Sequence, residues 1–83
     1  MNITVLGAGA WGTALAISLA QRHRVTLWAR NAQQIAEMRA TDKNQRYLPD
    51  VPLPAELGLE HNFDAALTAA QMIVLAVPIS ALR

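Results

Sequence analysis

The sequence predicts an α/β fold, in which helices cover both faces of a parallel sheet of about four strands. Segments rich in β-branched and apolar residues alternate along the chain with segments whose apolar residues recur every three or four positions. A continuous apolar run near the end is typical of a strand buried on both faces. Hydrophobic residues make up 53% of the 83 residues, enough for the core of one small domain. Alternation of this kind favours parallel strands joined by helices.

The first half of the chain contains two predicted strand–helix units. Residues 2–6, NITVL, are predicted as a buried strand, and residues 10–22 as a helix with a compact, alanine-rich face. Residues 24–29, RVTLWA, form the second predicted strand. The range Asn31–Ala40 follows as a second helix, in which the asparagine is a good N-cap.

The second half has a weaker pattern. Residues 41–56 contain three of the four prolines and are predicted as a long loop. Residues 58–63, GLEHNF, are a weak third strand, and residues 64–70, DAALTAA, a short helix. Residues 72–77, MIVLAV, are the buried fourth strand, which Pro78 ends. Right-handed crossovers then predict the strand order 3-2-1-4, with the first two helices on one face and the third on the other.

Composition excludes several classes of function. The net charge is +1 and no basic block occurs, which argues against nucleic acid and anionic membranes as partners. There is no cysteine for a disulfide or a thiolate. No positive segment precedes the first apolar run, and no run approaches the roughly 18 residues of a membrane span, so we expect a soluble, cytoplasmic protein.

Side chains that could ligate a metal or act in catalysis form no recognisable group in the sequence. The two histidines are isolated, and no acidic pair or nucleophilic triad can be placed, so we expect no metal ligand and no catalytic residue. The chain stops directly after an apolar run without a polar tail. We therefore expect residues 1–83 to be the N-terminal domain of a longer protein.

Three glycines separate the first strand from the first helix. Residues 7–12, GAGAWG, fit the pattern G-x-G-x-x-G in the strand-to-helix context that gives this pattern its meaning. Gly7 permits a tight turn, Gly9 lets a pyrophosphate approach the backbone, and Gly12 lets the helix pack closely on the strand. Free N–H groups at the helix start then bind the anion. The pattern predicts a dinucleotide-binding, Rossmann-type doubly wound sheet, of which this chain holds a part.

Arg30 and Trp11 bear on which dinucleotide binds and on what surrounds it. Arg30 follows the second strand, where proteins restricted to NAD carry an acidic residue for the ribose hydroxyl. An arginine pairs well with the 2′-phosphate of NADP, so we expect NADP, or both NADP and NAD, as cofactor. Trp11 has two interpretations, as an apolar anchor of the first helix or as a wall of the cofactor site.

Four stretches, GAGAWGTALA, LWAR, NQRYLP and VLAVP, resemble the bacterial NAD(P)-dependent glycerol-3-phosphate dehydrogenases over the whole chain. The resemblance implies reduction of dihydroxyacetone phosphate to sn-glycerol 3-phosphate, a precursor of phospholipids, by a homodimer. It also implies that an N-terminal domain binds the cofactor. A helical C-terminal domain would supply the catalytic lysines and most phosphate contacts, so these residues alone should be inactive.

The resemblance also assigns residues to parts of the cofactor. It places Ala10 and Trp11 at the diphosphate and Arg30 with Asn31 at the 2′-phosphate. It places Tyr47 near the cofactor or the closing cleft, and the backbone of Val77 and Pro78 beside the nicotinamide. The family often has serine directly after the Val-Pro pair, where this chain has Ile79 followed by Ser80.

Other functions fit parts of the pattern. Another NADP-dependent reductase, of the ketopantoate reductase type, would share the glycines but not the Arg-Tyr-Leu-Pro loop. A non-catalytic nucleotide-sensing module would share the whole binding turn and lack the catalytic domain. A flavoprotein would usually carry an acidic residue in place of Arg30.

Overall fold

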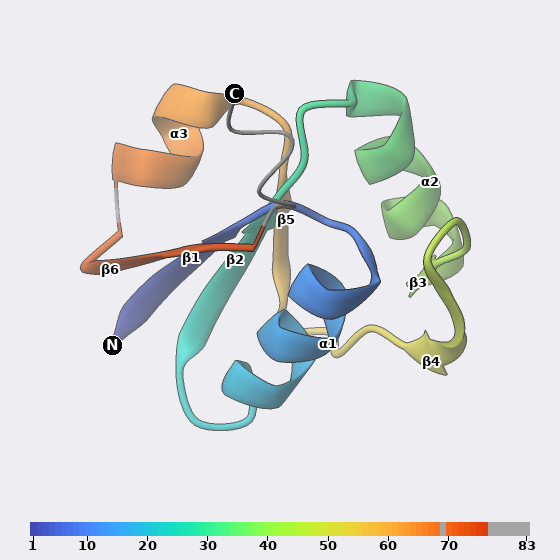
Figure 1. Cartoon of the computed structure of the whole chain (residues 1–83), viewed down its shortest axis with the longest axis horizontal. Coiled ribbons are helices and arrows are strands. Elements are labelled where there is room, and N and C mark those ends of the chain that lie inside the picture. The colour runs from blue at the N-terminus through green and yellow to red at the C-terminus, as the bar shows by residue number, and fades with distance from the viewer. Residues whose placement is uncertain (69, 77–83) are drawn as a thin grey trace.

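The computed structural model describes residues 1–68 and 70–76, and its centre is a four-stranded parallel sheet (Figure 1). The strands are β1 (Asn2–Leu6), β2 (Arg24–Trp28), β5 (Gly58–Glu60) and β6 (Met72–Leu75). They are arranged in the order β5-β2-β1-β6, and all three neighbouring pairs are parallel. This order is the predicted 3-2-1-4, so the predicted α/β fold class is confirmed.

Helices cover both faces of the sheet. Figure 1 shows α1 (Ala10–Leu19) and α2 (Ala32–Thr41) on one side and α3 (Phe63–Thr68) on the other. Strand alternation explains this division, because successive side chains point to opposite faces. On the α3 side, the buried Thr4 Oγ1 donates a hydrogen bond of 2.7 Å to the carbonyl of Ala66. The predicted distribution of the helices is therefore confirmed.

The hydrophobic core lies between the sheet and the pair α1 and α2. Alternate residues of β1 and β2 supply the sheet side, and the two helices supply the other. The buried cluster comprises Ile3, Val5, Ala8, Ala16, Val25, Leu27, Ala29, Ile35, Met38 and Leu57. These residues fix α1 and α2 against the strands whose carboxyl ends carry the glycine turn.

The predicted loop over residues 41–56 is wrong in part, because it contains a β-hairpin. The strands β3 (Lys43–Asn44) and β4 (Leu48–Pro52) pair antiparallel. Proline is tolerated in such a ribbon because each strand is an edge. Arg46 ties the hairpin to α2 through two hydrogen bonds to Glu37, of 3.0 and 3.2 Å.

The strand β6 differs from its prediction in burial. Its side chains Met72, Ile73 and Leu75 are between 46% and 54% exposed, although the apolar run predicted burial on both faces. Within residues 1–68 and 70–76, β6 pairs with β1 alone and is an edge strand. Apolar sequence therefore predicted the strand, but burial depends on neighbours that the described residues do not supply.

Polar side chains set the boundary between β5 and α3. The strand ends at Glu60, three residues earlier than predicted, where the carboxylate accepts hydrogen bonds of 3.0 Å from the N–H groups of His61 and Asn62. Asn62 Oδ1 then accepts from Ala65 N at 3.0 Å, in the manner of an N-cap. The helix α1 ends at Leu19, three residues before the predicted end at Arg22.

Candidate functional site

The candidate site is the turn between β1 and α1. Gly7 has a φ of 116°, a left-handed conformation that side chains strongly disfavour. Its N–H donates to the carbonyl of Trp28 at 2.9 Å, which holds the turn against the end of β2. The tight turn that the glycine pattern predicts is therefore present at the carboxyl edge of the sheet, where ligands of open α/β folds bind.

Gly9 and Gly12 have opposite surroundings. A Cβ at Gly12 would collide with the backbone carbonyl of Gly7 and would lie 3.1 Å from the Cβ of Ala76. Gly12 is thus required for close packing of α1 on the turn, as predicted. A Cβ at Gly9 would meet no atom within 4 Å. The space over Gly9 is open, so a ligand can approach its backbone.

The start of α1 offers free hydrogen-bond donors. Gly9 is the N-cap, and no side chain caps the helix. The first hydrogen bond of the helix runs from Thr13 N to Gly9 O at 3.0 Å. Across the described part of the chain, no group accepts from the N–H groups of Gly9, Ala10 or Trp11. Free N–H groups at the positive end of a helix dipole, under an open space, fit a phosphate anion.

A buried polar cluster lies on the inner side of the same turn. The carbonyl of Ala8 accepts from Asn44 Nδ2 at 2.8 Å and from Gln34 Nε2 at 3.0 Å. Asn44 Nδ2 also donates to Thr13 Oγ1 at 2.8 Å. Sequence reasoning assigned none of these side chains to the site. Gln34 could have been noticed, because it precedes Met38 by four residues and shares the buried stripe of α2.

Trp11 lies on the surface. Its side chain is 64% exposed, although it stands in the first turn of a helix that packs on the core. The interpretation of Trp11 as an apolar anchor of α1 is wrong for the part of the chain that the structure describes. A position beside an incoming ligand at the turn is compatible with this exposure.

Arg30 and Asn31 connect β2 to α2 beside the turn. Arg30 is exposed, and no described residue forms an ion pair with it. Asn31 caps α2, since its Oδ1 accepts from Gln33 N at 2.9 Å and from Gln34 N at 3.2 Å. The capping role predicted for Asn31 is therefore confirmed. Its oxygen is already engaged there, which leaves the amide nitrogen for any ligand.

The remaining predicted site residues are less informative. Tyr47 lies between the strands of the hairpin, is 52% exposed, and donates its N–H to Asn44 O at 3.2 Å. Val77 and Pro78 lie outside the described residues, as do Ile79 and Ser80. The structure thus brings together the glycine turn, Trp11, Arg30 and Asn31 at one edge.

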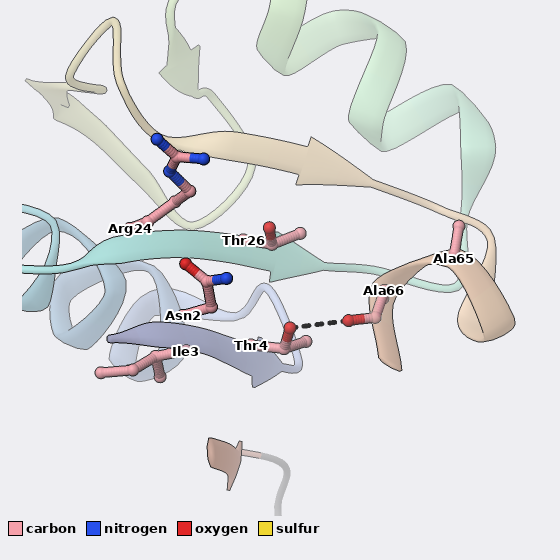
Figure 2. A pocket seen from close by; sticks show the side chains of 7 residues that line it. All are labelled: Asn2, Ile3, Thr4, Arg24, Thr26, Ala65 and Ala66. Atoms are coloured by element: carbon pink, nitrogen blue, oxygen red, sulfur yellow. Dashed lines mark hydrogen bonds between the residues drawn. The ribbon is translucent and has the colours of Figure 1, made fainter. Parts of the chain in front are cut away.

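A separate cavity opens on the α3 side of the sheet. Figure 2 shows Asn2 and Arg24, the first residues of β1 and β2, at this cavity of about 120 Å³ together with Thr26 and Ala65. It lies toward the amino ends of these strands and includes no residue of the turn. Among the described residues, no group of three metal-ligating side chains occurs. None of the helices in this part of the chain has the length and apolar character of a membrane span.

Comparison with known proteins gives a consistent result. A family model described as the N-terminus of NAD-dependent glycerol-3-phosphate dehydrogenase matches residues 2–83. Glycerol-3-phosphate dehydrogenases [NAD(P)+] from Thiobacillus denitrificans and Nitrosomonas europaea are 60% and 55% identical to the chain over 83 residues. The chain is covered completely in both alignments and spans 25% of each relative's length.

A solved structure shares both fold and sequence. The glycerol-3-phosphate dehydrogenase from Coxiella burnetii superposes with a TM-score of 0.86 at 41% identity. The match covers 93% of this chain and 24% of that one. The resemblance drawn from four sequence stretches is confirmed, and the ketopantoate reductase alternative is not favoured. The chain belongs to the family of the NAD-dependent glycerol-3-phosphate dehydrogenase N-terminus.

Proposed function

We propose that this chain binds the diphosphate of NADP(H) or NAD(H) at the turn between β1 and α1. The observation that carries the proposal is the open space over Gly9, next to N–H groups of Gly9, Ala10 and Trp11 that no described residue accepts. The neighbouring carbonyl of Ala8 faces inward to Asn44 and Gln34. The donors and the available space therefore suit an anion at this position.

Further residues would contact the cofactor along its length. Arg30 is an exposed cation without an ion-pair partner among the described residues, and it would pair with the adenosine 2′-phosphate of NADP. Asn31 would contribute its amide nitrogen beside it, and Trp11 would cover the diphosphate. Tyr47, Val77 and Pro78 are proposed as further contacts, on the resemblance alone.

For the whole protein, we propose reduction of dihydroxyacetone phosphate to sn-glycerol 3-phosphate. The names of the relatives, glycerol-3-phosphate dehydrogenase [NAD(P)+], support this reaction, and the chain spans about a quarter of their length. The cofactor supplies the hydride when bound, and the described residues position it. Within that protein, residues 1–83 would form the N-terminal cofactor-binding domain. The substrate would be bound by a C-terminal domain of a cytoplasmic homodimer.

Substitution of Gly9 tests the binding proposal. Gly9 has a φ of −75° and a ψ of −172°, an extended conformation that valine also adopts, and its Cβ would meet no protein atom. Gly9→Val should therefore fold normally, yet its side chain would occupy the space of the diphosphate. We expect NADPH binding, measured by fluorescence titration, to fall at least 100-fold, while the free energy of unfolding in urea changes by no more than about 1 kcal/mol, the cost of a poorer N-cap residue. Unchanged NADPH affinity in the folded variant would refute the proposal.

A further inference from the structure

The buried cluster beneath the turn has the geometry to orient it. Asn44 and Thr13 are fully buried and Gln34 is 8% exposed, and these three side chains come from β3, α1 and α2. Both amide nitrogens, Asn44 Nδ2 and Gln34 Nε2, donate to the carbonyl of Ala8. No buried side-chain nitrogen or oxygen among the described residues lacks a partner. Each buried polar side-chain atom of the cluster therefore has at least one hydrogen-bond partner.

The Ala8 carbonyl belongs to the same peptide group as the N–H of Gly9. The described part of the chain has no cis peptide, and in a planar trans peptide the C=O and the following N–H point in opposite directions. Two donors that hold the Ala8 oxygen toward the protein interior thus direct the Gly9 N–H away from the interior. Without them, rotation of this peptide plane would remove one donor from the anion site.

We propose that Asn44 and Gln34 are positioning residues for the cofactor, and that the β3–β4 hairpin acts on the phosphate-binding turn through Asn44. The inference rests on the proposed binding of NADP(H) at the turn. Asn44 reaches across 36 residues of sequence to the turn, so the hairpin contributes to the site without touching the ligand through this side chain. Gln34 gives the same carbonyl a second donor from α2.

Paired substitutions separate positioning from stability. Asn44→Leu and Gln34→Met keep approximate size and remove one donor each, and the double variant leaves the Ala8 carbonyl without a side-chain donor. Thr4→Val is the matched control, because it removes a buried hydrogen bond to a backbone carbonyl on the opposite face of the sheet. All four are made in the full protein chain, with urea unfolding as the measure of folding.

Two readouts are compared, NADPH affinity and amide hydrogen exchange over residues 5–16 in the ligand-free protein. We expect each single variant to bind NADPH about 3- to 10-fold more weakly and the double variant at least 30-fold. The Gly7 and Thr13 amides, bonded to Trp28 O and Gly9 O, should exchange faster. The control Thr4→Val should lose stability but keep its NADPH affinity within twofold.

The outcomes distinguish the two proposals. A wild-type protein that binds no NADPH contradicts the proposed function itself. A wild-type protein that binds NADPH, combined with a folded double variant of unchanged affinity and unchanged exchange, overturns the positioning role alone. If the double variant does not fold, Gln34→Met decides, because it leaves Asn44 in place. Equal losses of affinity in Gln34→Met and Thr4→Val would show that the cluster only stabilises the fold.

Discussion

The inner and outer sides of the glycine turn differ in what surrounds them. On the inner side, Gly12 leaves no room for a side chain, and the carbonyl of Ala8 has two buried donors. On the outer side, Gly9 faces open space and Trp11 is exposed. Residues of one motif thus serve two purposes: the inner side fixes the shape, and the outer side is left available to a ligand. Substitutions on the two sides should therefore have different consequences.

The largest effect is expected on the inner side. Gly12→Val would place a branched side chain against the carbonyl of Gly7 and the Cβ of Ala76. Overpacking of this kind costs about 1–3 kcal/mol, and more where backbone must move. We expect the free energy of unfolding in urea to fall by at least about 3 kcal/mol, with loss of NADPH binding as well. A Gly12→Val protein as stable as the wild type would contradict the close packing described for α1.

Substitution of Arg30 tests the proposed binding of the 2′-phosphate, farther from the glycines. A hydrogen bond to a charged group contributes about 1.5–3 kcal/mol. Arg30→Ala should thus weaken NADPH binding roughly 10- to 100-fold. NADH lacks the 2′-phosphate and should lose only a few-fold, and Arg30→Asp should shift preference toward NADH. Arg22→Ala, at an exposed arginine beyond the far end of α1, is the control. Equal losses of both affinities, measured as dissociation constants, would exclude recognition of the 2′-phosphate.

Asn31 combines a structural role with a proposed binding role, since it caps α2 and stands next to Arg30. Loss of an N-cap costs about 1 kcal/mol, so Asn31→Ala should lower the free energy of unfolding by that amount. Asn31→Asp keeps the acceptor for Gln33 N and Gln34 N and should keep the stability. Its added charge should weaken NADPH binding more than NADH binding if the 2′-phosphate lies beside it. Equal NADPH affinity in the wild type and Asn31→Asp would show that Asn31 does not lie beside the cofactor.

The smallest effect is expected from pH. The hydrogen bond from Arg46 lowers the pKa of Glu37 below its ordinary value of 4.5, and that from Asn62 N lowers the pKa of Glu60 in the same way. A carboxyl whose pKa is lower in the folded state stabilises the fold above its unfolded pKa and loses this contribution as pH falls. We expect the urea concentration at the unfolding midpoint to decrease slightly as the pH is lowered below about 4.5. In Glu37→Gln this decrease should be smaller. A midpoint that rises on acidification would contradict these assignments.

Local sequence patterns predicted most of the sheet and, within the site, the glycine turn. The range of β1 agrees with its prediction, and Asn31 caps α2, because β-branched runs and capping residues act through near neighbours. The glycine spacing likewise predicted the turn. The contacts of Asn44 and Thr13 with the turn could not be foreseen, because they depend on a hairpin whose two short strands have little periodicity. The exposure of β6 was equally hidden, since burial is a property of the surroundings.

The most direct test of diphosphate binding at the turn is to observe which amides respond to the cofactor. In a titration of ¹⁵N-labelled protein with NADPH, each backbone N–H reports its own environment. We expect the largest shifts at Gly9, Ala10 and Trp11, a further response at Arg30 with NADPH but not with NADH, and little change around Asn2 and Arg24 at the other cavity. Shifts confined to that cavity, or the absence of shifts at the turn under saturating NADPH, would show that the turn does not bind the diphosphate.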